Sequence, residues 1–66
     1  MVVSEKEALY HISHEEQLYE WGRFDRETLK GKLEYFIGVL SDYNYSKAVD
    51  ECNRVNRKYG FSISIE

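Results

Sequence analysis

Proline is absent from this sequence of 66 residues, and cysteine occurs once, at Cys52. A single thiol excludes an intrachain disulfide. The absence of proline and of low-complexity runs favours one compact domain over residues 1–66 rather than a linker or a tail. No stretch is long and apolar enough for a membrane span, and the first residues lack the basic flank and apolar run of a signal peptide. We therefore expect a cytoplasmic protein without a membrane partner.

Positive charge is scarce in the first part of the chain. Residues 1–25 carry six acidic and two basic side chains, whereas residues 26–66 carry six acidic and seven basic ones, which gives a net charge of −3. Non-specific affinity for nucleic acid comes from basic side chains that displace counterions from phosphates, so this distribution disfavours a nucleic-acid partner. The alternative is a nucleic-acid-associated regulator that uses the basic cluster Arg54, Arg57 and Lys58. A helix C-terminus, however, attracts such residues without any ligand.

Two helices are expected, over residues 26–40 and 45–59. Asp25 is a suitable N-cap for the first helix, and Asn44 or Ser46 for the second. Gly60 has the position typical of the residue that ends a helix in the left-handed conformation. Apolar residues at helical spacing predict the buried sides of the two helices: Leu29, Leu33, Phe36, Ile37 and Leu40 in the first, and Ala48, Val49, Cys52, Val55 and Tyr59 in the second.

The last residues, 61–66, alternate in polarity, with Phe61, Ile63 and Ile65 on one side, and this pattern predicts a β-strand. A lone strand leaves its backbone groups unpaired, so a partner is needed upstream. We expect a β-hairpin within residues 7–24, formed by 7–13 and 18–24. The resulting fold class is α+β, in the order β-β-α-α-β, with an antiparallel sheet packed on a helical hairpin. The alternative is a short N-terminal helix, with the strand paired to Val2 and Val3 or to a second subunit.

Gly31 and Gly38 lie inside the first expected helix, seven residues apart and away from its apolar side. Glycine within a helix costs about 1 kcal/mol relative to alanine, so the pair needs a reason. One interpretation is a seam where another backbone packs closely. The other is a tolerated pair on the surface.

No combination of residues predicts chemistry. His11 and His14 are three residues apart, but zinc requires three or four ligands, and the pattern that places a base beside the metal is missing. Cys52 falls in an apolar stripe within a helix, where we expect it to be buried as a small apolar residue. We therefore expect no catalytic, metal or cofactor site, and no enzyme.

Aromatic residues are numerous for a sequence of this length, with six Tyr, three Phe and one Trp. Several have acidic or amide neighbours rather than the cations that accompany stacking on single-stranded nucleic acid. Tyr and Trp are enriched where proteins bind proteins. The expected function is a small regulator or inhibitor that binds another protein, with a homodimer also allowed. The expected interface comprises Tyr19, Trp21, Phe24, Tyr43 and Tyr45, and the alternative is that these residues, with Tyr10, belong to the core or its margin.

Overall fold

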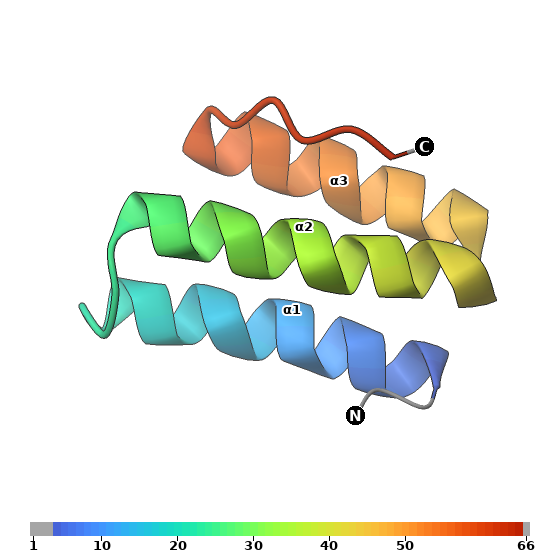
Figure 1. Cartoon of the computed structure of the whole chain (residues 1–66), viewed down its shortest axis with the longest axis horizontal. Coiled ribbons are helices and arrows are strands. Elements are labelled where there is room, and N and C mark those ends of the chain that lie inside the picture. The colour runs from blue at the N-terminus through green and yellow to red at the C-terminus, as the bar shows by residue number, and fades with distance from the viewer. Residues whose placement is uncertain (1–3, 66) are drawn as a thin grey trace.

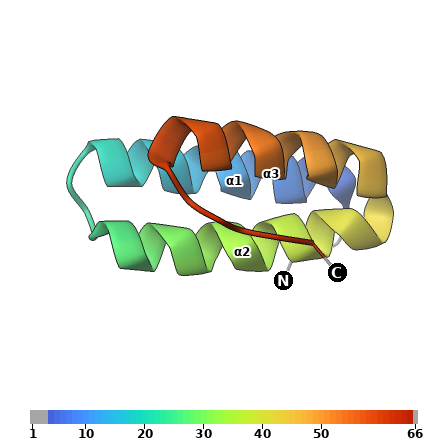
Figure 2. The same ribbon diagram turned by 90° about the horizontal axis from the view of Figure 1, so that it is seen from above.

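Three helices and an extended C-terminal segment make up the part of the chain that the computed structural model describes, residues 4–65. Helix α1 spans Glu5–Glu20, α2 spans Arg26–Tyr43 and α3 spans Tyr45–Tyr59 (Figure 1). Helix α2 packs against both other helices, whereas no Cα atom of α1 lies within 8 Å of one of α3. Figure 2 shows α1 and α3 on the same side of α2. Helix α2 therefore forms the apex of an open, flat arrangement that measures 30 × 23 × 14 Å.

Local signals determine where each helix begins. The N-cap residues Ser4, Asp25 and Asn44 have extended backbones, and each side chain accepts a hydrogen bond from the backbone N–H three residues later, at 3.2, 2.8 and 3.1 Å. Each bond satisfies a donor that a helix start leaves unpaired. Asn44 also ends α2, so one residue separates α2 from α3. Helix α3 ends at Gly60, whose φ of 74° is the left-handed conformation that glycine adopts without strain.

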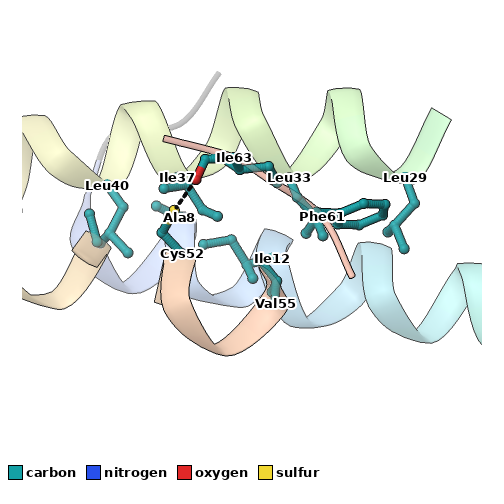
Figure 3. Close-up of a cluster of buried hydrophobic side chains, with 11 residues drawn as sticks. Ala8, Ile12, Leu29, Leu33, Ile37, Leu40, Cys52, Val55, Phe61 and Ile63 are labelled. Carbon is teal, nitrogen blue, oxygen red and sulfur yellow. Dashed lines mark hydrogen bonds between the residues drawn. The ribbon is translucent and has the colours of Figure 1, made fainter. Parts of the chain in front are cut away.

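The buried core draws on all three helices and on the C-terminal segment, as Figure 3 shows. Helix α2 contributes only leucine and isoleucine side chains to it, and α3 contributes smaller residues. Its members are Ala8, Ile12, Leu29, Leu33, Ile37, Leu40, Ala48, Cys52, Val55, Phe61 and Ile63. The expected burial of Cys52 is confirmed.

The expected N-terminal hairpin is wrong, because residues 5–20 form one helix. In a strand, Ala8, Tyr10 and Ile12 would share a face. In the structure Ala8 and Ile12 are fully buried, while Tyr10 is 61% exposed. Burial instead recurs at helical spacing, and the N-cap at Ser4 starts the helix in the way the capping signals allowed.

The expected strand and sheet are also wrong, because residues 4–65 form an all-helical bundle rather than an α+β fold. Residues 61–65 are extended, with Phe61 and Ile63 buried and Ser62 and Ser64 exposed, but they lie along helices instead of a strand (Figure 2). The requirement for a strand partner fails because the side chain of Asn56 pairs with the backbone of Ile63 at both its N–H and its carbonyl. Residues 1–3 and 66, which include Val2, Val3 and the last residue of the expected strand, lie outside the described part.

The two later helices lie close to the ranges expected for them. Helix α2 continues three residues beyond the expected end at Leu40, and Asn44 provides its C-cap. Helix α3 has the same range as the expected helix, 45–59.

Candidate protein-interaction surfaces

The five aromatic residues expected to form one interface lie at opposite ends of the molecule. Tyr19, Trp21 and Phe24 are at the α1–α2 turn, and Tyr43 and Tyr45 flank the α2–α3 junction; Figure 1 shows the two connections at opposite ends of the helices. Trp21, Tyr43 and Tyr45 are exposed, by 61%, 49% and 57%. The structure therefore does not bring the five residues together into a single surface.

Tyr19 and Phe24 belong partly to the core. Both are half-buried and pack against the buried cluster. The ring of Tyr19 lies 5.8 Å from that of Tyr59 in an edge-to-face arrangement and 6.5 Å from that of Phe24, and Tyr59 in turn lies 5.6 Å from Phe61. Such pairs stabilise a fold through burial and ring geometry. These two residues therefore close one end of the core, which is the alternative considered for them.

A different set of rings forms a continuous surface across α1 and α2. Tyr10 contacts His11 and His14, with ring centroids 5.6 and 5.5 Å apart, and His11 stacks on Phe36 of α2 at 4.7 Å. Phe36 meets Tyr35 edge to face at 5.1 Å. We call this set, Tyr10, His11, His14, Tyr35 and Phe36, the aromatic face. Its two outer members, Tyr10 and Tyr35, are the most exposed tyrosines in the described residues, at 61% and 62%.

The aromatic face continues along α2. Tyr35, Val39 and Tyr43 follow one another at intervals of four residues, so they lie on the same side of the helix. Tyr43 is thus the one member of the expected interface that shares a side of α2 with the aromatic face. The spacing of Tyr35, Val39 and Tyr43 is visible in the sequence, but the leucine stripe of the same helix gives a stronger periodic signal.

A polar seam joins α1 to α3, whose backbones do not touch. Glu16 is only 5% exposed and accepts hydrogen bonds from two nitrogens of Arg54, at 3.0 and 2.5 Å, and from the hydroxyl of Tyr59 at 3.0 Å. The Nζ of Lys58 lies 3.5 Å from Glu16 and 3.3 Å from Glu20. A carboxylate in this position is tolerated because charged and hydroxyl donors satisfy it.

The ionisation of Glu16 follows from these contacts. Burial by itself raises the pKa of Glu16, but the hydrogen bonds from Arg54 and Tyr59 and the charges of Arg54 and Lys58 together outweigh it, so the pKa lies below its ordinary value. The hydrogen bonds that Arg54 donates to Glu16 and then to Glu51 raise the pKa of Arg54. Burial, followed by the charge of Glu16, raises the pKa of the Tyr59 hydroxyl. At neutral pH the seam therefore consists of an ionised Glu16, a cationic Arg54 and a neutral Tyr59.

The seam engages Arg54 and Lys58, two of the three members of the basic cluster that a nucleic-acid-associated regulator would use. Arg54 is bound to Glu16 and also to Glu51, at 2.9 Å, and Lys58 is bound to Glu20. An open groove of about 450 Å³ between α1 and α3 is lined by residues of both charges, namely Ser13, Glu16, Gln17, Glu20, Glu51, Arg54 and Lys58. Phosphate binding would require Arg54 and Lys58 to leave carboxylate partners, and this weighs against the alternative.

A second buried acid, Glu15, faces α2 rather than α3. It is 8% exposed, and its Oε2 lies 3.6 Å from the Nζ of Lys32 without a hydrogen bond from any described residue. Lys32 also lies over the ring of Phe24, at 5.5 Å. Glu15 and Lys32 therefore form a loose ion pair at the α1–α2 interface.

Gly31 and Gly38 lie on the exposed side of α2. A Cβ atom built at either position meets no atom within 4 Å. Within the described chain, therefore, neither glycine is required for close packing. Their role as a seam for another backbone stays a prediction.

The histidines and the cysteine have packing partners. His11 and His14 are stacked on Phe36 and Tyr10, and the thiol of Cys52 donates to the carbonyl of Ile63 at 3.0 Å. Burial raises the pKa of this thiol, which a bond from Asn56 partly opposes. Among residues 4–65, no three His, Cys, Asp or Glu side chains are grouped as metal ligands would be.

None of the described helices combines the length and apolar character that crossing a membrane requires. Comparisons of this chain with protein-family models, with curated proteins and with solved structures gave no match.

Proposed function

We propose that this protein is a non-enzymatic regulator or inhibitor that binds another protein through its aromatic face. The observation that carries the proposal is the unbroken series of ring contacts from Tyr10 through His11 and Phe36 to Tyr35, which ends in two tyrosines exposed by about three fifths. Tyrosine supplies a large contact area at low entropic cost and is common at binding hot spots.

The rings are already held in position before any partner arrives. His14 stacks on Tyr10 within 13° of parallel, and His11 on Phe36 within 10°. A surface whose side chains are fixed in the free protein loses less conformational entropy on binding. The stacked arrangement of these rings supports a binding role for the aromatic face more than for Tyr45 or Trp21. No ring partner is found for either of those two among the described residues.

The location proposed for this activity is the cytoplasm. The free thiol of Cys52 is compatible with a reducing compartment, where cysteines stay unpaired.

The test compares capture of cellular proteins by the immobilised wild type and by the double variant Tyr10→Ser/Tyr35→Ser. The matched control is Tyr45→Ser, which removes a tyrosine of similar exposure, 57%, at the α2–α3 junction. We expect one or more proteins to be captured by the wild type and by the control but lost by the double variant. Substitutions on exposed positions change stability by about 0.5 kcal/mol or less, so thermal melting should show all three to be folded.

Equal capture by the wild type and the double variant would refute the role of the aromatic face. Loss of capture with Tyr45→Ser alone would move the interface to the α2–α3 junction.

A further inference from the structure

The C-terminal segment, residues 61–65, packs against Cys52 and Asn56 of α3 and Arg26 of α2, and we call the site that it occupies the α2–α3 groove. It turns back at the end of α3 and runs along that helix (Figure 1), and it crosses from α3 toward α2 when seen from above (Figure 2). Phe61 and Ile63 point into the core (Figure 3), where they are 7% and 5% exposed. Ser62 and Ser64 are exposed. The groove thus binds every second side chain of an extended peptide.

Helix α3 also recognises the backbone of this segment. The Nδ2 of Asn56 donates to the carbonyl of Ile63 at 2.8 Å, and the N–H of Ile63 donates to the Oδ1 of Asn56 at 2.9 Å. The thiol of Cys52 donates to the same carbonyl (dashed line in Figure 3). One amide side chain therefore does what a neighbouring strand does in peptide recognition by sheet edges: the backbone bonds hold the peptide, and pockets for alternate side chains select it.

A single residue connects the segment to α3. Gly60 has a φ of 74°, and the chain reverses there. Arg26 secures the turn, because its guanidinium donates to the carbonyl oxygens of Tyr59 and Gly60, at 2.6 and 3.2 Å, and lies 4.5 Å from the centre of the Phe61 ring. Apart from this connection through Gly60, only non-covalent contacts hold the segment on α2 and α3.

We propose that this groove also binds residues 61–65 of a second copy of the chain, through reciprocal exchange of the two segments about Gly60. A second copy carries the same segment, so Asn56, Cys52 and the two apolar sites would receive the partner segment through the contacts that they make within one chain, as would Arg26 through its contact with the Phe61 ring. The bonds from Arg26 to the carbonyls of Tyr59 and Gly60 belong to the hinge and are not part of this set. Exchange of an identical element is a low-cost route to a dimer, and short hinges favour it. The proposal concerns the α2–α3 groove and does not depend on the aromatic face of α1 and α2.

The protein concentration determines whether the closed monomer or the exchanged dimer dominates. The attached segment has an effective concentration of the order of millimolar, as short connections have, so the wild type should exchange only near about 1 mM. In the closed monomer, Gly60 has the left-handed conformation, so a residue that disfavours this conformation destabilises the monomer. Each dimer forms from two monomers, so the destabilisation counts twice. Because this conformation costs a non-glycine residue about 1–2 kcal/mol, Gly60→Ala should lower the dissociation constant of the dimer by roughly 30-fold or more.

The experiment is sedimentation velocity on the full chain from roughly 10 µM to roughly 1 mM, which brackets the effective concentration of a short linker. The matched control is Gly22→Ala, since Gly22 has a φ of 77°, no atom within 4 Å of a built Cβ, and a place in the α1–α2 turn. We expect Gly60→Ala to dimerise at much lower concentration than the wild type, and Gly22→Ala to behave as the wild type does. Gly60→Asn should lie between, because asparagine tolerates this conformation better than alanine.

Filtered NOE spectra of a dimer made from ¹³C-labelled and unlabelled copies identify its interface. Exchange predicts intermolecular NOEs between the Phe61 ring and the core methyl groups of Leu29 or Val55. A dimer whose intermolecular NOEs involve Tyr10 and Tyr35 instead, or no dimer of Gly60→Ala at any concentration, overturns the proposal. If Gly60→Ala is unfolded when dilute, its helicity by circular dichroism must rise with concentration, and helicity that stays flat also overturns it.

Discussion

The substitution Arg54→Met tests whether the polar seam stabilises the fold. Arg54 makes two hydrogen bonds to Glu16, whose side chain is 7% exposed, while the arginine side chain itself is 42% exposed. Methionine retains much of the packing of the arginine stem but removes both donors and the charge. The substitution therefore leaves a buried carboxylate with Tyr59 and Lys58 as its remaining partners.

The expected loss lies between two limits. Removing one partner of a fully buried ion pair costs about 3–5 kcal/mol, whereas an exposed pair contributes about 0–1 kcal/mol. The pair here is buried on the Glu16 side only, and two partners remain, so we expect a loss of about 2 kcal/mol at pH 7. A domain of this size has a free energy of unfolding of about 3–10 kcal/mol, so the loss is a large share of the total. The midpoint of thermal unfolding should fall by roughly 8–16 °C.

The loss of stability caused by Arg54→Met should depend on pH. The pKa of Glu16 is lower in the folded protein than in the unfolded chain, where it is about 4.3. Such a group stabilises the fold above its unfolded pKa, and this stability is lost as the pH falls through the folded pKa. Arg54→Met removes the main cause of the lowered pKa. The difference in stability between wild type and variant should therefore be full at pH 7 and should shrink as the pH falls below about 4.3.

Urea unfolding followed by circular dichroism, at several pH values between roughly 3 and 7, measures this difference. The matched control is Arg57→Met, which removes the same charge from the exposed side of α3, where no ion pair joins Arg57 to a described residue; it should cost about 0.5 kcal/mol or less. In the background of Arg54→Met, adding Glu16→Gln should cost little, because the unpaired charge is then gone. A loss from Arg54→Met equal to that of the control, or a loss that is the same at pH 3 and pH 7, would refute the reasoning.

Two further predictions concern α2 and the C-terminal segment. The double variant Gly31→Ala/Gly38→Ala should raise the free energy of unfolding by about 1–2 kcal/mol in the isolated protein, because both positions have open space for a methyl group and alanine favours a helix; destabilisation in urea would show that the space is not free. Asn56→Ala should destabilise the fold by about 1–2 kcal/mol through loss of its two bonds to Ile63, and should speed alkylation of Cys52 by iodoacetamide in native conditions. An unchanged alkylation rate would show that the segment does not control access to the thiol.

Local signals in the sequence were enough to locate the two later helices. Asp25 and Asn44 cap them, Gly60 ends the last one, and apolar residues at helical spacing form their buried sides. These features act over a few residues of chain, so a single sequence displays them. The local signals of the N-terminal segment conflicted with the expected topology, because its capping residues favoured a helix whereas the expected C-terminal strand required a hairpin.

Only the tertiary structure determined which residues and segments, distant in the sequence, are in contact. Glu16 and Arg54 are 38 positions apart in the sequence, and nothing near either residue indicates the pair. The extended segment needed backbone partners, as the sequence implied, but one amide side chain on α3 supplies them in place of a strand. The aromatic face depends on the antiparallel packing of α1 on α2, which brings His11 against Phe36. Helix boundaries follow from short-range hydrogen bonding and periodicity, whereas a surface or a buried ion pair exists only after distant elements have packed together.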